Sequence, residues 1–256
     1  MTRLLAIDLN ADLGETAGDL ALMSVITSAN VACGGHAGDR SSMAAAVDAA
    51  LAHGVAIGAH PSYADHDGFG RVELGLRPAE IASLVEEQVC YLRDVATLAG
   101  GRIAYVKLHG ALYHRAGRDL ECAETILEAL ERIGVGPSAV LAQPGAAMLT
   151  AAQGRGWVGV EEGFCDRLYR PDGTLADRLE PGSVIETPAM AARQAVSLAV
   201  DGGTFAGDGT WVALRPASLC LHGDTPDALN AARATRTALE DVGVGVASFA
   251  AGPAGG

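Results

Sequence analysis

The chain has 256 residues, and its 31 acidic against 18 basic side chains give a formal net charge of −13. This excess of negative charge argues against nucleic acid and membranes as partners, although a small anionic substrate responds only to the local field of its site. No apolar run approaches the ~20 residues of a membrane helix, and no signal peptide is recognisable at the start. The length suits one domain, which we expect over residues 1–250, with a flexible tail at 251–256.

The sequence holds five cysteines, an odd number with no Cys-x-x-Cys spacing. This pattern is typical of reduced thiols, so we expect a cytoplasmic protein. Cys33 and Cys220 lie beside polar motifs, but both also belong to apolar runs, which favours a role as small buried side chains.

Apolar segments of strand length alternate with segments of helical periodicity along the whole chain. The expected strands are Leu4–Asn10, Val25–Cys33, Gly54–Ala59, Ile103–Val106, Ala139–Ala142, Trp157–Val160, Ala217–Leu221 and Val244–Phe249. The expected helices follow Asp39, begin at Pro78, Asp119 and Pro226, and cover 144–153 and 188–200. A polar loop at 62–75 has the length of a lid or binding loop, and 202–209 resembles a turn. We therefore predict an α/β fold, a (β/α) barrel rather than an open sheet.

The first expected strand ends in four side-chain acceptors within eight residues, namely Asp8, Asn10, Asp12 and Glu15. A turn would explain some of this polarity, but its density favours a functional site. Asparagine is rare in the chain, and Asn10 and Asn30 both lie in apolar runs at strand ends.

Four of the seven histidines lie at or just after strand ends, at positions 36, 60, 109 and 222. Helix capping does not require His36, whereas Asp39 fits either a helix N-cap or a site residue. The sixth strand continues into Glu162 and Arg167, and the seventh is followed by Asp224. Arg167 could form a surface pair with the preceding aspartate or hold an anion.

Lys107 is the only lysine in the chain, beside seventeen arginines. This bias indicates a position where arginine does not suffice, since lysine is a compact point charge that can lose its proton when desolvated. Lys107 and His109 follow a strand and point the same way, because strand side chains repeat every second residue. A lysine left on the surface by chance is the alternative.

Barrel sites lie at the carboxyl ends of the strands, where all these candidates fall. Crowded carboxylates and imidazoles shift one another's proton affinities, which suits general acid–base catalysis. A divalent metal stays open, since Asp and His are good ligands but no His-Glu-x-x-His pair occurs. A covalent serine enzyme is disfavoured because Gly-x-Ser-x-Gly is absent. A Walker nucleotide site is excluded because the single lysine follows valine.

Motifs along nearly the whole chain resemble the LamB/YcsF family. They are 8–15 (DLNADLGE), 28–39 (SANVACGGHAGD), 58–61 (GAHP), 68–71 (GFGR), 106–113 (VKLHGALY), 166–169 (DRLY) and 222–224 (HGD). The resemblance implies a barrel of the glycoside hydrolase/deacetylase type, TIM-like and with seven strands. It also implies ATP-dependent opening of 5-oxo-L-proline to L-glutamate, together with separate B and C subunits that could bind the ATP.

The resemblance and the strand-end pattern together assign roles to the candidates. The catalytic candidates are Asp12, His36, Lys107 and His109, with Asp12 or His36 as base and Lys107 stabilising an oxyanion or phosphoryl group. The substrate-binding candidates are Asp8, Asn10, Glu15, Asn30, His60, Glu162, Arg167, His222 and Asp224.

Four positions depart from the family pattern. Leu108 stands where proline is usual, Gly35 replaces an aromatic residue, Ser62 replaces glycine and Val72 replaces arginine. Two other functions stay open: a stand-alone metal-dependent deacetylase or amidohydrolase, and a non-catalytic subunit that completes a partner's site.

Overall fold

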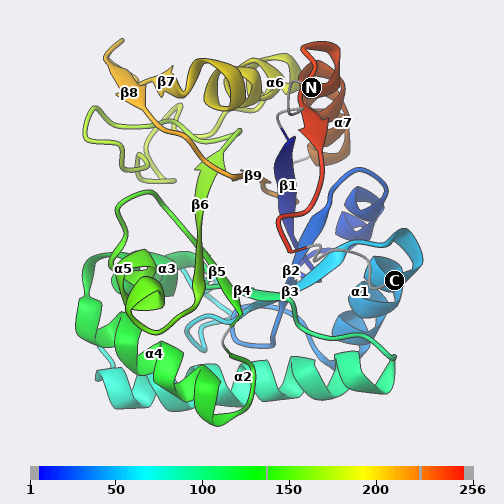
Figure 1. The fold of residues 1–256 in the computed structure, drawn as a ribbon, viewed down its shortest axis with the longest axis vertical. Helices are drawn as coiled ribbons and strands as arrows, with labels where there is room; N and C mark the ends of the chain where they lie inside the picture. The colour runs from blue at the N-terminus through cyan, green and yellow to red at the C-terminus, as the bar shows by residue number, and fades with distance from the viewer. Residues whose placement is uncertain (1–5, 137, 225–226, 251–256) are drawn as a thin grey trace.

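The computed structural model describes residues 6–136, 138–224 and 227–250. At its centre seven parallel strands form a closed barrel (Figure 1). In order around the barrel they are β1 (Ala6–Leu13), β2 (Ser28–Ala32), β3 (Ala56–His60), β4 (Tyr105–Lys107), β5 (Ala139–Ala142), β6 (Val158–Phe164) and β9 (Ser218–Leu221). Pairing of β1 with β9, with Asp8 opposite Ser218, closes the cylinder. The predicted seven-stranded (β/α) barrel is confirmed.

Helices cover the outside of the barrel (Figure 1). They are α1 (Arg40–His53), α2 (Pro78–Leu98), α3 (Gly110–Arg118), α4 (Leu120–Arg132), α5 (Ala147–Gly154), α6 (Pro188–Val196) and α7 (Ala228–Asp241), with a 3₁₀ turn η1 (Asp19–Ser24) and a π turn η2 (Ser197–Asp201). Pro78 opens α2, whose buried side chains Ile81, Val85, Val89 and Leu92 recur at helical spacing against the barrel. No helix in the described residues is long and apolar enough to cross a membrane.

The alternation of side chains along β1 separates an apolar outer layer from a polar barrel interior. Leu9, Ala11 and Leu13 are buried in the main apolar cluster, which includes the covering helices. Asp8 and Asp12 alternate with these residues along the strand and are also buried, each at most 4% exposed to solvent. Strand side chains alternate between faces, so the polar set points into the barrel. The interior therefore carries charged and amide groups beside a small apolar cluster of Tyr105, Leu141 and Val160, whereas branched apolar residues usually dominate such barrels.

Several elements differ from the sequence-based expectation. β1 continues to Leu13, because its last residues pair with β2. The short helix α3 precedes the predicted helix at 119, with Leu112, Tyr113 and Ala116 as its buried face. The expected turn at 202–209 is the start of a hairpin of β7 (Gly203–Phe205) and β8 (Trp211–Ala213), and the expected helix at 188–200 ends at 196 and continues as η2.

The last strand is also shorter than expected. Only β10 (Gly245–Val246) is a strand, and it pairs with Ala6 and Ile7 at the start of β1. The Phe249 ring meets the Tyr105 ring edge-on at 5.1 Å. The expected helix start at Pro226 and the expected tail at 251–256 lie outside the described residues, and α7 is described from Ala228.

Candidate active site

A cavity of about 830 Å³ lies at the carboxyl ends of the barrel strands. Six of the predicted site residues line it: Asp12, His60, Lys107, His109, Arg167 and His222. The loop after β3, which contributes Phe69 and Arg71, and the segment after β6, which contributes Arg178, complete the wall. The predicted convergence of distant strand ends is therefore present.

Lys107 is the centre of the polar barrel interior. Its ammonium lies 2.8 Å from Glu162 Oε1 and 3.1 Å from Asp12 Oδ1, and it donates to Asn10 Oδ1 at 3.2 Å and to Cys220 Sγ at 3.1 Å. Burial lowers the pKa of Lys107, but Asp12, Cys220 and Glu162 together outweigh burial and hold that pKa well above its usual range. These neighbours favour the protonated form of the lysine, as the predicted role in stabilising an oxyanion or phosphoryl group requires.

The asparagines hold Asp12 in place. Asn30 donates through Nδ2 to Asp12 Oδ1 at 2.7 Å and to Asn10 Oδ1 at 2.8 Å, and the Tyr105 hydroxyl donates to Asn30 Oδ1 at 2.7 Å. Burial raises the pKa of Asp12, but the interactions of Asp12 with Lys107 and His60 together outweigh burial and hold that pKa well below its usual range. Asp12 is thus an ionised carboxylate at the cavity wall.

Asp8 lies deeper in the barrel and does not line the cavity. Its carboxylate accepts hydrogen bonds from Thr27 at 2.7 Å, from Ser28 at 2.6 Å and from Ser218. Burial raises the pKa of Asp8 to about 6, in spite of these three donors. Glu162 is equally buried, and it accepts from the Tyr113 hydroxyl at 3.1 Å. Asp8, Glu162 and the two asparagines therefore form a layer beneath the cavity that supports Asp12 and Lys107.

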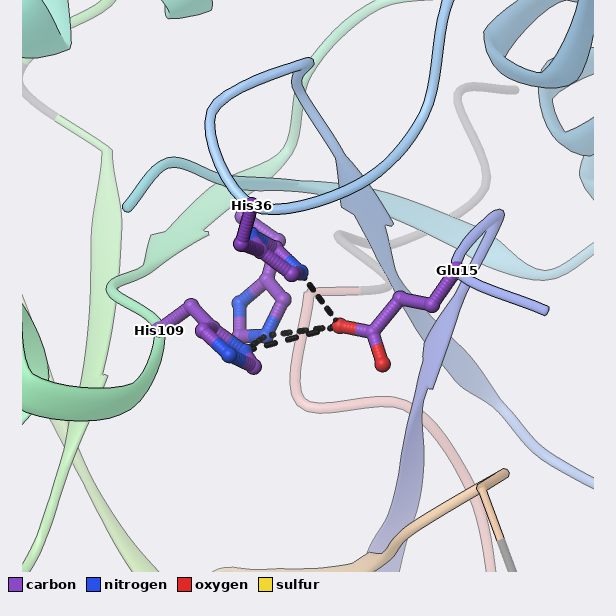
Figure 2. Close-up of side chains that lie close together, drawn as sticks. Glu15, His36 and His109 are labelled. Carbon is purple, nitrogen blue, oxygen red and sulfur yellow. Dashed lines mark hydrogen bonds and ion pairs between the residues drawn. The ribbon is translucent and has the colours of Figure 1, made fainter. Parts of the chain in front are cut away.

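Three histidines lie around the Glu15 carboxylate beside the cavity, and Figure 2 shows two of them, His36 and His109. His36 Nε2 lies 2.6 Å from Glu15 Oε1, His109 Nδ1 lies 3.5 Å from it and His60 Nε2 lies 3.8 Å from it. The rings of His36 and His109 stack in parallel at 3.6 Å. Burial lowers the pKa of His36 to about 2 and the pKa of His109 well below its usual range. Burial and the Asp12 charge raise the pKa of Glu15.

The loop after β3 approaches this cluster closely. Phe69 has a φ of 53°, a left-handed conformation that is unusual for an aromatic residue. The strain directs the Phe69 carbonyl oxygen to His109 Nε2 at 2.9 Å. A side chain on Gly70 would meet His36 Cβ at 2.9 Å, so only glycine fits there.

The cavity wall carries four arginines whose partners differ, and Arg170 pairs with Glu180. Arg71 and Arg178 both bind Asp224, at 2.8 and 2.6 Å, so this predicted substrate ligand is already engaged. Buried Arg167 donates to the Ala176 carbonyl oxygen at 2.6 Å, and its Nε has no hydrogen-bond partner. Among the described residues no carboxylate forms an ion pair with Arg167. Its guanidinium is a cation available to an anionic ligand.

The preceding Asp166 does not pair with Arg167, contrary to one of the two sequence-based interpretations. It accepts instead from the His222 backbone N–H at 2.9 Å and lies 3.0 Å from His222 Nδ1, which fixes that ring at the cavity wall. Asp39, which fitted either role, is exposed and caps α1 by accepting from the Ser42 N–H at 2.8 Å.

Sequence reasoning missed several functional neighbours. Asp166 and Tyr113 belong to the family motifs, so the sequence could have predicted that they lie in the site, beside His222 and Glu162. Arg71 also belongs to a motif, whereas Arg178 lies in an irregular segment with no pattern that predicts its contact with Asp224.

Two groups of side chains have ligand atoms close enough to hold a metal ion. One is Glu15 with the three histidines 36, 60 and 109, and the other is Asp12 with Cys220 and His222. Within each group the ligand atoms lie within 4.8 Å of one another.

Comparison with known proteins gives concordant results. The model of the LamB/YcsF family matches residues 7–253. The A subunit of 5-oxoprolinase from Streptomyces coelicolor is 48% identical over 95% of this chain and 100% of its own length. The crystal structure of a lactam utilization protein from Thermus thermophilus superposes with a TM-score of 0.87 at 41% identity, covering 96% of this chain and 100% of that one. A family 4 carbohydrate esterase from Streptomyces lividans, at 10% identity and a TM-score of 0.50 over 95% of this chain and 92% of its own, shares the barrel fold alone.

Proposed function

Because the chain belongs to the LamB/YcsF family, we propose that it is the A subunit of a 5-oxoprolinase, which opens 5-oxo-L-proline to L-glutamate. The observation that carries the proposal is its likeness, over nearly the full length, to relatives of that name. The cavity adds chemical support, since it combines fixed cations with ionised and neutral bases at one mouth of the barrel.

Arg167 is the group best suited to bind the substrate carboxylate. The protein as a whole is acidic, but the cavity wall is locally cationic, and Arg71 and Arg178 are neutralised by Asp224. A buried guanidinium without an acidic partner gains most from a carboxylate or phosphoryl oxygen, because both can form charge-assisted hydrogen bonds with it.

Lys107 and Asp12 are the groups best suited to the hydrolytic step. Lys107 is held as a compact cation that can stabilise the negative charge on the phosphoryl group, or on an oxyanion, when water attacks the ring carbon. Asp12 lines the cavity and can orient that water and accept its proton. His36 does not line the cavity, and its Nε2 is engaged by Glu15, so Asp12 is the better of the two predicted bases.

A five-membered lactam resists hydrolysis, and its re-closure is intramolecular, so the reaction requires coupling to ATP. Phosphorylation of the amide oxygen would activate the ring carbon, so that water adds to it and the C–N bond breaks with the protonated ring nitrogen as the leaving group. A second water then hydrolyses the resulting acyl phosphate to glutamate and inorganic phosphate. The chain has no Walker motif, so we assign ATP binding and this activation to the B and C subunits. This chain then delivers water and collapses the intermediate. All five cysteines have free thiols, which supports a cytoplasmic location.

The test is a reconstitution of purified A, B and C chains with 5-oxoproline and ATP, with glutamate and ADP as the readouts. We expect Lys107→Arg to lower kcat by about 10² or more, as loss of an oxyanion donor does. Arg167→Met is expected to raise KM for 5-oxoproline about tenfold with a smaller change in kcat. His114→Gln, a change at the same cavity wall, is the control.

Other outcomes would replace the proposal. Undiminished glutamate formation by Lys107→Arg would remove the role given to the lysine. Activity that survives the double change Asp12→Ala and His36→Ala would make this chain a structural component that completes its partners' site. Hydrolysis by this chain alone, without ATP and lost to a chelator, would make it a stand-alone amidohydrolase.

A further inference from the structure

Two of the clustered histidines have their outer ring nitrogens fixed as donors. His60 Nδ1 lies 2.8 Å from the Lys107 carbonyl oxygen, and His109 Nε2 lies 2.9 Å from the Phe69 carbonyl oxygen. A carbonyl oxygen only accepts hydrogen bonds, so each of these nitrogens carries the proton. In the neutral rings the opposite nitrogens, His60 Nε2 and His109 Nδ1, therefore present lone pairs.

The third ring is fixed through a serine. His36 Nδ1 lies 2.9 Å from Ser62 Oγ, and the Ser62 hydroxyl donates its own proton to the Tyr63 carbonyl oxygen at 2.8 Å. Ser62 Oγ must then accept from His36 Nδ1, which leaves a lone pair on His36 Nε2.

All three lone pairs point into one space with the Glu15 carboxylate, and Figure 2 shows His36 and His109 turned toward it. His60 Nε2 and His109 Nδ1 are only 3.0 Å apart, and His36 Nε2 is 2.6 Å from Glu15 Oε1. Acceptors at such distances repel unless a cation lies among them.

We propose that Glu15, His36, His60 and His109 bind one divalent transition-metal ion of the Zn²⁺ type. Imidazole and carboxylate ligands suit this ion, and tetrahedral ligands at its usual bond lengths are about 3.3 Å apart. The contacts from Glu15 Oε1 to the three ring nitrogens span 2.6 to 3.8 Å, which brackets this separation. The outer acceptors, two carbonyls and a hydroxyl, are the partners that orient ligating histidines in metal sites.

The second candidate group already contains a fixed cation. The Lys107 ammonium lies 3.1 Å from both Asp12 Oδ1 and Cys220 Sγ, so it already engages two of the three groups that an ion would need. Among the described residues, no lysine or arginine forms an ion pair with Glu15. The geometry therefore favours the histidine cluster.

The site adjoins the proposed reaction centre. His60 Nε2 is 3.4 Å from Asp12 Oδ1, and both His60 and His109 line the cavity. A bound ion would supply Lewis-acid character at this wall. The assignment stands on ring tautomers and distances alone, so it holds whichever substrate the cavity takes.

The experiment measures metal content rather than catalysis. The purified full chain is stripped with a chelator, incubated with Zn²⁺, desalted and analysed by inductively coupled plasma mass spectrometry. Parallel samples take up Co²⁺, whose visible absorption reports a nitrogen and oxygen ligand set. We expect about one ion per chain for the wild type and for the control His114→Gln, whose imidazole lines the cavity outside the cluster.

Glu15→Gln and His109→Gln are expected to lower the affinity at least about tenfold and to abolish the Co²⁺ bands. The amide in Glu15→Gln can donate a hydrogen bond to a facing ring nitrogen, so we expect this variant to fold even where His109→Gln does not. Circular dichroism of both variants checks that they are folded. If the wild type retains neither Zn²⁺ nor Co²⁺, the proposal is overturned. That result would indicate that a proton shared among the ring nitrogens and the Glu15 carboxylate holds the cluster together. Wild-type affinity in folded Glu15→Gln overturns it as well.

Discussion

Asp8 allows a quantitative test of the polar barrel interior. Its carboxyl group is 1% exposed, and burial raises its pKa from 3.8 to about 6. The folded state therefore binds the Asp8 proton more tightly than the unfolded state does. Stability must then fall as pH rises between about 4 and about 6, because the unfolded carboxyl ionises first. At neutral pH the total cost is about 3 kcal/mol.

The perturbation is Asp8→Asn, which keeps the side-chain shape and removes the titration. The amide changes the hydrogen bonds with Thr27, Ser28 and Ser218, but this effect does not depend on pH. We expect the unfolding free energy of the variant, relative to wild type, to rise by about 2 kcal/mol from about pH 4.5 to about pH 7.5.

The assay is urea unfolding followed by circular dichroism at several pH values in that range. Asp48→Asn, at an exposed position on α1, is the matched control and should show no such trend. A difference between Asp8→Asn and wild type that is constant with pH, or that falls as pH rises, would refute the reasoning about burial.

Three further predictions concern packing and charge. Gly58→Ala should destabilise by about 1–3 kcal/mol in urea unfolding, because its Cβ would lie 2.2 Å from Cζ of buried Tyr105; equal stability would contradict this overpacking. Lys107→Met should lower the free energy of unfolding by about 3–5 kcal/mol at neutral pH, since it leaves the buried Asp12 and Glu162 carboxylates without their cation. The loss should be smaller in acid, and a loss that does not change with pH would contradict this explanation. Gly35→Phe should lower the melting temperature, because a Cβ at 35 would lie 2.5 Å from both Ser62 Oγ and Gln88 Oε1. Adding Ser62→Gly should restore part of the lost melting temperature. If it restores none, the clash with Gln88 alone causes the loss.

The pattern of polar residues in apolar strands predicted most of the fold and much of the site. Alternation in β1 places Asp12 inward, and the isolated Lys107 does lie at the centre of the interior. The first inference follows from strand geometry, in which side chains repeat every second residue, and the second from the composition, since Lys107 is the only lysine in the chain.

What the sequence did not predict depends on contacts between irregular segments. The pairing of Asp224 with Arg71 and Arg178 joins three loops, and no periodicity relates them. The departures Gly35 and Ser62 looked unrelated in the sequence, yet the Ser62 hydroxyl fills the space that a side chain at 35 would occupy. That one side chain fills the space of another can be recognised only when the segments that carry positions 35 and 62 are placed side by side in the structure.

The register of β1 has a consequence for how the chain is made. On the ribosome β1 emerges first, but two of its three partners, β9 and β10, are synthesised last. Until Ser218 emerges, one edge of β1 has unpaired backbone groups that could recruit another nascent chain. Closure over more than two hundred residues is a slow, late event. Fragments that stop short of β9 should therefore aggregate, and the barrel should form only after its last strands have been translated.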